Sequence, residues 1–166
     1  MKRKLKLVKL IAYHKVAYYT LLDVDGKTLT DKFFDEYKVD SELVDKLNDI
    51  HSWLEDIGEN RSARKNLFRK ERNAVALPPE AHITGHYYEP GERTLRLYCV
   101  WVDESIVILL SGSEKTHNEV MKCEKCKPHF IFANSIAYQV SKMIEENKFK
   151  FKEKSIKNVK KIVFEA

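Results

Sequence analysis

The fold is decided by one stretch of the chain, which reads TLRLYCVWV at residues 94–102, DES at 103–105 and IVILL at 106–110. The first and last of these segments are rich in β-branched and aromatic residues, which favour β-strands. The polar segment between them is short enough to turn the chain back on itself. The pattern therefore predicts two neighbouring antiparallel strands.

Further strands are predicted on the N-terminal side of this stretch. The sequence EPGE at residues 89–92 has proline and glycine where a β-turn prefers them, so residues 82–88 are predicted to form a third strand of a meander. Residues 4–12 alternate between polar and apolar side chains, and residues 16–22 are β-branched and aromatic. These two segments predict an N-terminal hairpin.

Helices are predicted before and after the meander. The first predicted helix is short and carries three aromatic residues, Phe33, Phe34 and Tyr37. The second carries one apolar stripe that ends before Gly58 and consists of Leu43, Leu47, Ile50, Leu54 and Ile57. Residues 61–76 are predicted to continue helically, and residues 130–146 to form a last helix. Residues 159–164 are a candidate edge strand among lysines.

The order of these elements predicts an α+β fold with a twisted antiparallel sheet and flanking helices. We expect a single domain over residues 1–166, with an N-terminal hairpin at 1–26 and a basic C-terminal extension at 147–166.

The composition excludes several classes of protein. An apolar fraction of 43% can build a core, which argues against intrinsic disorder. Three cysteines are too few for a disulfide scaffold and favour a reducing compartment. No run approaches the ~20 apolar residues that a membrane-spanning helix needs. The expectation is a soluble, cytoplasmic protein.

Positive charge is concentrated in one part of the chain. The formal net charge is +5, and six of the seven arginines lie between Arg61 and Arg96. Arginine binds phosphate through two parallel hydrogen bonds, whereas lysine acts more as a point charge. This segment is therefore a candidate phosphate-binding surface, the alternative being a solvated helical face; its basic residues are Arg61, Lys65, Arg69, Lys70 and Arg72.

Several motifs give the chain a resemblance to the RelE/HigB superfamily of toxin ribonucleases from type II toxin–antitoxin modules. Two predicted helices precede the strand Leu95-Arg96-Leu97-Tyr98, and the following strand continues into Gly112 and Lys115-Thr116. The chain is most similar to a divergent branch with a Pro-His-Phe-x-x-Ala-Asn segment, which here begins at Pro128.

The resemblance implies a metal-independent endoribonuclease that cleaves mRNA, often on the ribosome, and is neutralised by an antitoxin protein. In that chemistry the RNA 2′-OH attacks the adjacent phosphate, with a base, an acid and cations assisting. Arg96 matches the strand arginine of the motif and Lys115 matches its basic loop. His86 or His117 could transfer protons, and Tyr88 could stack on a base.

The sequence also departs from that pattern. Glu114 stands where the loop of the family usually carries a second basic residue, and the first predicted strand of the meander has no arginine. A catalytically degraded module that binds RNA or protein is therefore the alternative reading. A small zinc or redox protein is a third, because four candidate zinc ligands fall within thirteen residues: His117, Cys123, Cys126 and His129.

Overall fold

A computed structural model describes residues 2–166 and shows an α+β protein built around one large sheet. Its seven strands are ordered β3-β4-β5-β6-β2-β1-β9, and a separate two-stranded sheet is formed by β7 and β8. The strands are β1 (Lys4–Ala12), β2 (Ala17–Leu22), β3 (Arg69–Glu71), β4 (Ala74–Leu77), β5 (Thr94–Asp103), β6 (Ile106–Lys115), β7 (Phe151–Lys152), β8 (Ser155–Ile156) and β9 (Val163–Glu165).

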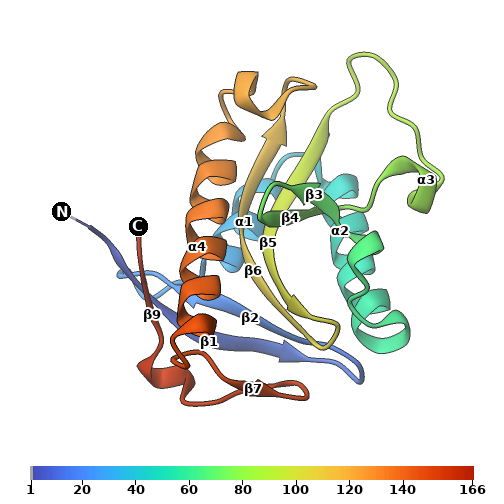
Figure 1. Cartoon of the computed structure of the whole chain (residues 1–166). Helices are drawn as coiled ribbons and strands as arrows, with labels where there is room; N and C mark the ends of the chain where they lie inside the picture. The colour runs from blue at the N-terminus through green and yellow to red at the C-terminus, as the bar shows by residue number, and fades with distance from the viewer. Residues whose placement is uncertain (1) are drawn as a thin grey trace.

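Four α-helices and several short helical turns join these strands (Figure 1). The helices are α1 (Leu29–Tyr37), α2 (Val44–Asp56), α3 (Ala81–Thr84) and α4 (Lys127–Glu145). The short turns are the π turn η1 (Ile57–Arg61) and the 3-10 turns η2 (Lys65–Leu67), η3 (Val120–Lys122) and η4 (Val159–Lys161). None of the helices within residues 2–166 combines the length and apolar character needed to cross a membrane.

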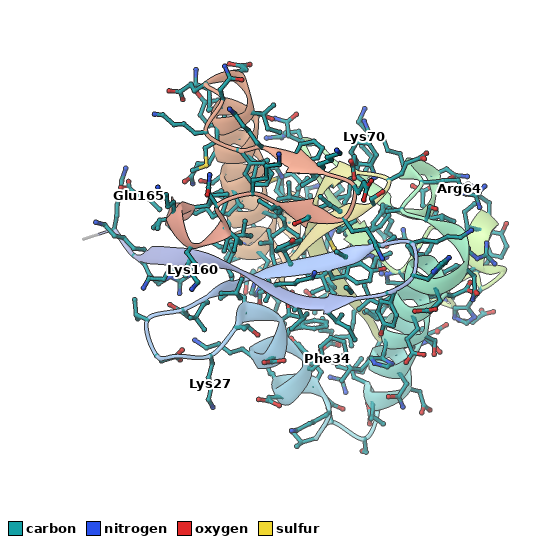
Figure 2. The ribbon with its side chains drawn as sticks, turned by 90° about the horizontal axis from the view of Figure 1, so that it is seen from below. Lys27, Phe34, Arg64, Lys70, Lys160 and Glu165 are labelled. Atoms are coloured by element: carbon teal, nitrogen blue, oxygen red, sulfur yellow. A yellow bond between two sulfur atoms is a disulfide. The ribbon has the colours of Figure 1, made fainter. Side chains whose placement is uncertain are left out.

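The sheet separates two apolar cores. Seen from below, α4 lies on one side of the sheet and α1 and α2 lie on the other (Figure 2). On the first side, Phe130, Ile136 and Val140 of α4 pack with the sheet. On the second, Phe33 and Ile50 belong to the core that covers the opposite face. Because successive strand residues point to opposite faces, β5 contributes to both cores.

The predicted strand pair at residues 94–110 is confirmed. β5 and β6 are antiparallel, and Arg96 lies opposite Ser113. The N-terminal hairpin is also confirmed, since β1 and β2 pair antiparallel. One pairing was not predicted: β2 runs parallel to β6, with Ala17 opposite Ile106. This pairing joins the N-terminal hairpin to the meander.

The predicted helix over residues 61–76 is wrong. After α2 and its π turn the chain leaves helical geometry at Ser62, whose φ is 70°. The Ala63 N–H then donates to the Glu104 carbonyl, and Trp101 donates its indole N–H to Ala63 O at 2.7 Å. Tertiary hydrogen bonds therefore override the local helical pattern, and β3 and β4 form a hairpin in this region.

The predicted strand at residues 82–88 is wrong as well. Residues 81–84 form the one-turn helix α3, which ends at Gly85 with a φ of 77°. The strand beside β5 is β4, with Ala76 opposite Tyr98. At the other end of the sheet, β9 pairs with β1, so the predicted edge strand exists but covers only residues 163–165.

Candidate functional site

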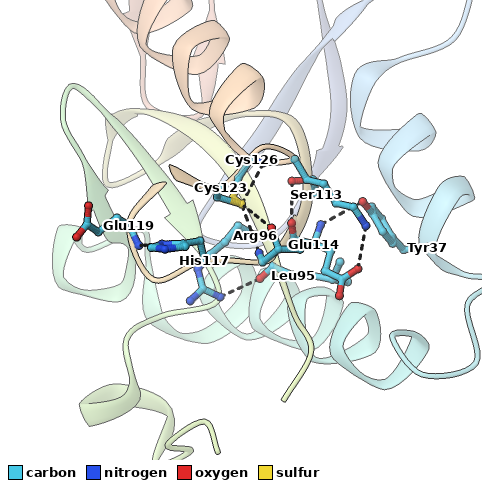
Figure 3. Close-up of a disulfide and its surroundings, with 11 residues drawn as sticks. Tyr37, Leu95, Arg96, Ser113, Glu114, His117, Glu119, Cys123 and Cys126 are labelled. Atoms are coloured by element: carbon cyan, nitrogen blue, oxygen red, sulfur yellow. Dashed lines mark hydrogen bonds and ion pairs between the residues drawn. A yellow bond between two sulfur atoms is a disulfide. The ribbon is translucent and has the colours of Figure 1, made fainter. Parts of the chain in front are cut away.

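The most unusual charged group of the structure is the guanidinium of Arg96 on β5. Only 4% of the surface of this residue is exposed. Its Nη1 donates to Thr94 Oγ1 and to the Leu95 carbonyl, both at 3.0 Å, while its Nε has no partner (Figure 3). Within residues 2–166 it forms no ion pair. A buried charge without an ion-pair partner destabilises a fold, so the guanidinium of Arg96 is available to pair with an anion from outside the chain.

Close approach of β6 keeps Arg96 in place. Gly112 lies opposite Leu97, and a Cβ at Gly112 would come within 1.8 Å of the Arg96 carbonyl oxygen. Only glycine allows the two strands to approach this closely here. The guanidinium carbon of Arg96 also lies 5.8 Å from the centre of the Tyr88 ring, and Lys46 Nζ lies 5.2 Å from the same ring centre. Tyr88, predicted to stack on a base, therefore packs against two cations of the protein.

Three more ionisable groups interact with Arg96 through their charges, although none of them forms an ion pair with it in residues 2–166. Lys115 ends β6, and Arg69 and Glu71 lie on β3. Burial and the charge of Arg96 lower the pKa of the Lys115 ammonium, while Glu71 acts against this. Burial raises the pKa of the Glu71 carboxyl, although Lys115, Arg96 and Arg69 pull it down. We call these four residues the basic cluster; it combines three cations with one carboxylate.

Arg69 contributes its charge without an internal carboxylate partner in the described part of the chain. Its Nε donates to Pro78 O at 2.9 Å, and its Nη2 donates to Pro79 O at 3.4 Å. These carbonyls orient the guanidinium but leave its charge uncompensated. Burial, followed by repulsion from Arg69, lowers the pKa of Arg96. The repulsion within the cluster would be relieved by a bound anion.

Asn134 of α4 fixes the hairpin that carries Arg69 and Glu71. Its Oδ1 accepts from the backbone N–H groups of Asn73 and Ala74 at 2.8 and 3.2 Å. Its Nδ2 donates to the Glu71 carbonyl at 3.0 Å. One side chain therefore satisfies three backbone groups at the β3–β4 turn. This arrangement gives Glu71 a defined position beside the other charges.

A second polar group without a partner lies on the same face of the sheet. Tyr98 is 1% exposed, and its hydroxyl has no hydrogen bond. Burial raises the pKa of this phenol, and the charge of Glu71 raises it further. Tyr98 lies two residues beyond Arg96 on β5, so a buried hydroxyl and the Arg96 Nε are both unpaired on one face.

A cavity of about 590 Å³ opens beside the basic cluster. Its walls are the loop before β5 and the loop after β6, and both Arg96 and Lys115 line it. The remaining lining residues are Tyr88, Glu89, Pro90, Gly91, Glu92, Arg93, Thr94, Glu114, Thr116, His117 and Asn118. Arg69 and Glu71 are absent from this lining. The predicted residues Arg96, Lys115 and His117 are thus brought to one place.

The two histidines predicted to transfer protons differ in position. His117 lines the cavity, and its Nδ1 accepts the Glu119 N–H at 3.0 Å, which leaves Nε2 to carry the proton of a neutral ring (Figure 3). His86 is outside that cavity and half exposed, with its Nε2 2.7 Å from Glu92. Hydrogen bonds from Lys46, Glu89 N–H and His86 lower the pKa of Glu92 to about 2.

The predicted basic helix does not exist, and its residues are dispersed. Arg69 joins the cluster, whereas Lys70 is exposed on β3 (Figure 2). Arg61 pairs with Asp56 at 2.6 Å. The other two cations lie over aromatic rings: Lys65 is 4.4 Å from the centre of Trp101, and Arg72 is 5.3 Å from that of Phe130. A strand hairpin cannot present these residues on one face at helical spacing.

The cysteine pair lies directly behind the cavity wall. Cys123 and Cys126 form a disulfide, and both are fully buried (Figure 3). The Cys123 sulfur accepts from the Thr116 N–H at 3.3 Å, which ties the loop after Lys115 to the start of α4. His129 is half-buried, and burial lowers its pKa. No group of three or more metal-ligating side chains occurs in residues 2–166. The zinc site stays a prediction.

Glu71 is the member of the cluster that the sequence pattern does not reveal. In the predicted helix over residues 61–76 it is one acidic residue among arginines. The alternation of Arg69 and Glu71 along a strand was the available signal, because residues two apart on a strand share a face.

Comparison of the chain with protein-family models, with curated proteins and with solved structures finds no match.

Proposed function

We propose that this protein is a RelE/HigB-type endoribonuclease whose basic cluster binds a phosphate of mRNA. The observation that carries the proposal is the buried guanidinium of Arg96, which has no carboxylate partner and lies with Lys115 and Arg69 around a single carboxylate. Such an arrangement suits the negatively charged phosphate of a transition state. The observed order of the β1–β2 hairpin, α1 and α2, the antiparallel strands β3 to β6, and α4 is compatible with the same assignment.

The proposed reaction uses the RNA 2′-OH as the nucleophile. Glu71 accepts the 2′-OH proton, and burial, which raises the pKa of its carboxyl, makes it a stronger base than an exposed glutamate. Arg96, Lys115 and Arg69 stabilise the charge that develops on the phosphate. The Nε2–H of the neutral His117 ring donates a hydrogen bond to the departing 5′-oxygen, which takes its proton from water, and Glu71 then returns the 2′-OH proton to water.

The atoms balance without an added reactant. A bond forms between the 2′-oxygen and phosphorus, and the bond from phosphorus to the 5′-oxygen breaks. The products are a 2′,3′-cyclic phosphate and a 5′-hydroxyl end. We further propose that ribosome-bound mRNA is the substrate, that the reaction takes place in the cytoplasm, and that an antitoxin protein covers the basic cluster.

A binding module without cleavage is the second candidate. Glu114 favours it, because this carboxylate is held by Arg93 at 2.8 Å and by Lys125 at 3.4 Å and leaves Lys115 as the single cation at the end of β6. Fewer cations around the phosphate weaken transition-state stabilisation more than they weaken binding.

Cleavage of ribosome-bound mRNA by the purified chain tests the proposal. Glu71→Gln preserves the size of the side chain and removes the base, so we expect cleavage to fall by about 10²–10⁴-fold while mRNA binding persists. The matched control is Glu124→Gln, an exposed residue whose substitution should change neither property.

Three outcomes are informative. Cleavage by Glu71→Gln at the wild-type rate would contradict the role of Glu71 as the base. Binding of mRNA by the wild-type chain without any cutting would favour the second candidate. Failure of the wild-type chain to bind mRNA would contradict the endoribonuclease and the RNA-binding form of the second candidate.

A further inference from the structure

The cavity beside the basic cluster has a different electrostatic character from the cluster. Its lining contains the carboxylates Glu89, Glu92 and Glu114 and the cations Arg93, Arg96 and Lys115, so its formal charges balance. The basic cluster has three cations and one carboxylate. A phosphate therefore favours the cluster, and an uncharged group favours the cavity.

Arg96 and Lys115 belong to both places. They line the cavity, and they also act on the charge of Glu71, which lies outside the cavity lining. A phosphate held by both Arg96 and Lys115 would lie at the edge of the cavity, and Glu71 would act on it from outside the cavity lining. Whatever is attached to that phosphate on the far side from Glu71 must enter the cavity.

The cavity has the size and the free polar groups that a nucleoside requires. Its volume of about 590 Å³ falls in the range of roughly 300–1,000 Å³ typical of small-molecule sites. Asn118 has no hydrogen bond within the described residues, and the Nε2 of His117 is free. Thr94 accepts from Arg96 and can still donate its hydroxyl proton. These groups can bind ribose hydroxyls and the edge of a base.

One wall of the cavity is held in place before any ligand binds. Glu92 receives hydrogen bonds from His86 at 2.7 Å and from the Glu89 N–H at 3.0 Å, and Lys46 of α2 pairs with it. Arg93 is fixed from the other side by Asp40 at 3.0 Å. A preformed wall lowers the entropy lost when a ligand binds.

We propose that this cavity binds the nucleoside on the 3′ side of the scissile phosphate, the one that leaves with the 5′-oxygen. The direction in which the RNA lies across the site follows from in-line displacement, in which the attacking and leaving oxygens lie on opposite sides of phosphorus. Glu71 takes the proton from the attacking side, so the leaving nucleoside lies on the cavity side, next to His117. This inference rests on the proposed function, because the assignment of the nucleoside to the 3′ side depends on Glu71 as the base.

Calorimetric titration of the intact chain with small phosphates tests the inference without any cleavage. The probes are inorganic phosphate, ribose 5-phosphate, and the four 5′- and four 3′-nucleoside monophosphates. With its phosphate on Arg96, a 5′-monophosphate places its nucleoside in the cavity, whereas a 3′-monophosphate directs its nucleoside toward Glu71. We expect at least one 5′-monophosphate to bind about tenfold more tightly than inorganic phosphate and than its 3′ isomer.

Substitution of a cavity residue locates the gain in affinity. Asn118→Ala should remove most of the advantage of the 5′-monophosphate and leave the affinity for inorganic phosphate unchanged. Asn48→Ala, at an exposed position on α2, is the matched control and should change neither affinity.

The outcomes separate the two proposals. If no probe binds, the phosphate site is wrong, and the proposed function and this inference both fail. If inorganic phosphate binds as tightly as every 5′-monophosphate, or if the 3′ isomers bind more tightly, only this inference fails. A loss of 5′-monophosphate affinity in Asn118→Ala, with normal phosphate binding, supports it.

Discussion

Arg93 and Arg96 are three residues apart in sequence, and their surroundings are opposite. Arg93 pairs with Asp40 at 3.0 Å, with Glu42 at 2.9 Å and with Glu114 at 2.8 Å, and these carboxylates raise its pKa. Arg96 is more deeply buried, has no carboxylate partner in residues 2–166, and has its pKa lowered by burial. One cation is compensated by the protein, and the other is not.

The difference shows that an arginine's neighbours, more than its type, indicate its role. Arg93 links the loop before β5 to the segment between α1 and α2 and to β6, so its interactions hold the cavity wall together. The Nε of Arg96 has no hydrogen-bond partner, and its guanidinium forms no ion pair in residues 2–166. Stability should therefore depend on Arg93, and ligand binding on Arg96.

Of the two arginines, Arg96 gives the larger expected effect, through the substitution Arg96→Met. Methionine has a similar shape without the charge, so the variant should lose about 10²–10³-fold in cleavage rate. Because a buried uncompensated charge is replaced by an apolar group, its stability should equal or exceed that of the wild type. Urea unfolding and mRNA cleavage measure the two quantities. A large fall in stability would mean that Arg96 is a structural residue.

A moderate effect of the opposite kind is expected for Arg93→Met. The substitution leaves three carboxylates close together without their shared cation, so we expect the melting temperature to fall by several degrees. Cleavage should fall only a few-fold, through a less ordered cavity wall. Circular dichroism during heating provides the measurement. If Arg93→Met abolishes cleavage without changing the melting temperature, the contrast between the two arginines is wrong.

The smallest effect concerns the pH dependence of stability. Burial raises the pKa of Glu71 above its ordinary value of 4.5, so between the two values the folded state binds more protons than the unfolded chain. Stability from this group is present at low pH and is lost as pH rises through the raised pKa. The urea midpoint of the wild type should therefore fall relative to that of Glu71→Gln as the pH is raised from 4 to 8. A constant difference would contradict the raised pKa.

The parts of the fold that sequence predicted well are those in which local pattern and tertiary structure agree. β5 and β6 are apolar on both faces because cores lie on both sides of the sheet, and their composition showed it. Residues 61–76 were misassigned because their spacing of apolar residues also fits a helix. Only the hydrogen bonds from Ala63 to Glu104 and from Trp101 to Ala63 reveal why a helix cannot continue.

The candidate site was predicted in part for a related reason. Arg96 and Lys115 lie on well-predicted strands, and the motif that singled them out was local. Glu71 and Arg69 depend on the β3–β4 hairpin and on its anchor, Asn134, which lies about 60 residues further along the chain. Long-range contacts of this kind leave no periodic signal. His86 pairs with Glu92, six residues along the chain, and lies outside the cavity that holds His117.

The parallel pairing of β2 with β6 has a consequence for the synthesis of the protein. Ala17 lies opposite Ile106, so β2 leaves the ribosome long before its partner. At about 5–20 residues per second, the roughly 90 intervening residues take about 5–18 s to translate. During that interval one edge of β2 has no strand beside it, which exposes it to chaperones and to other chains. Arg96 and Lys115 emerge at the end of this interval, so the basic cluster cannot assemble before the sheet can close.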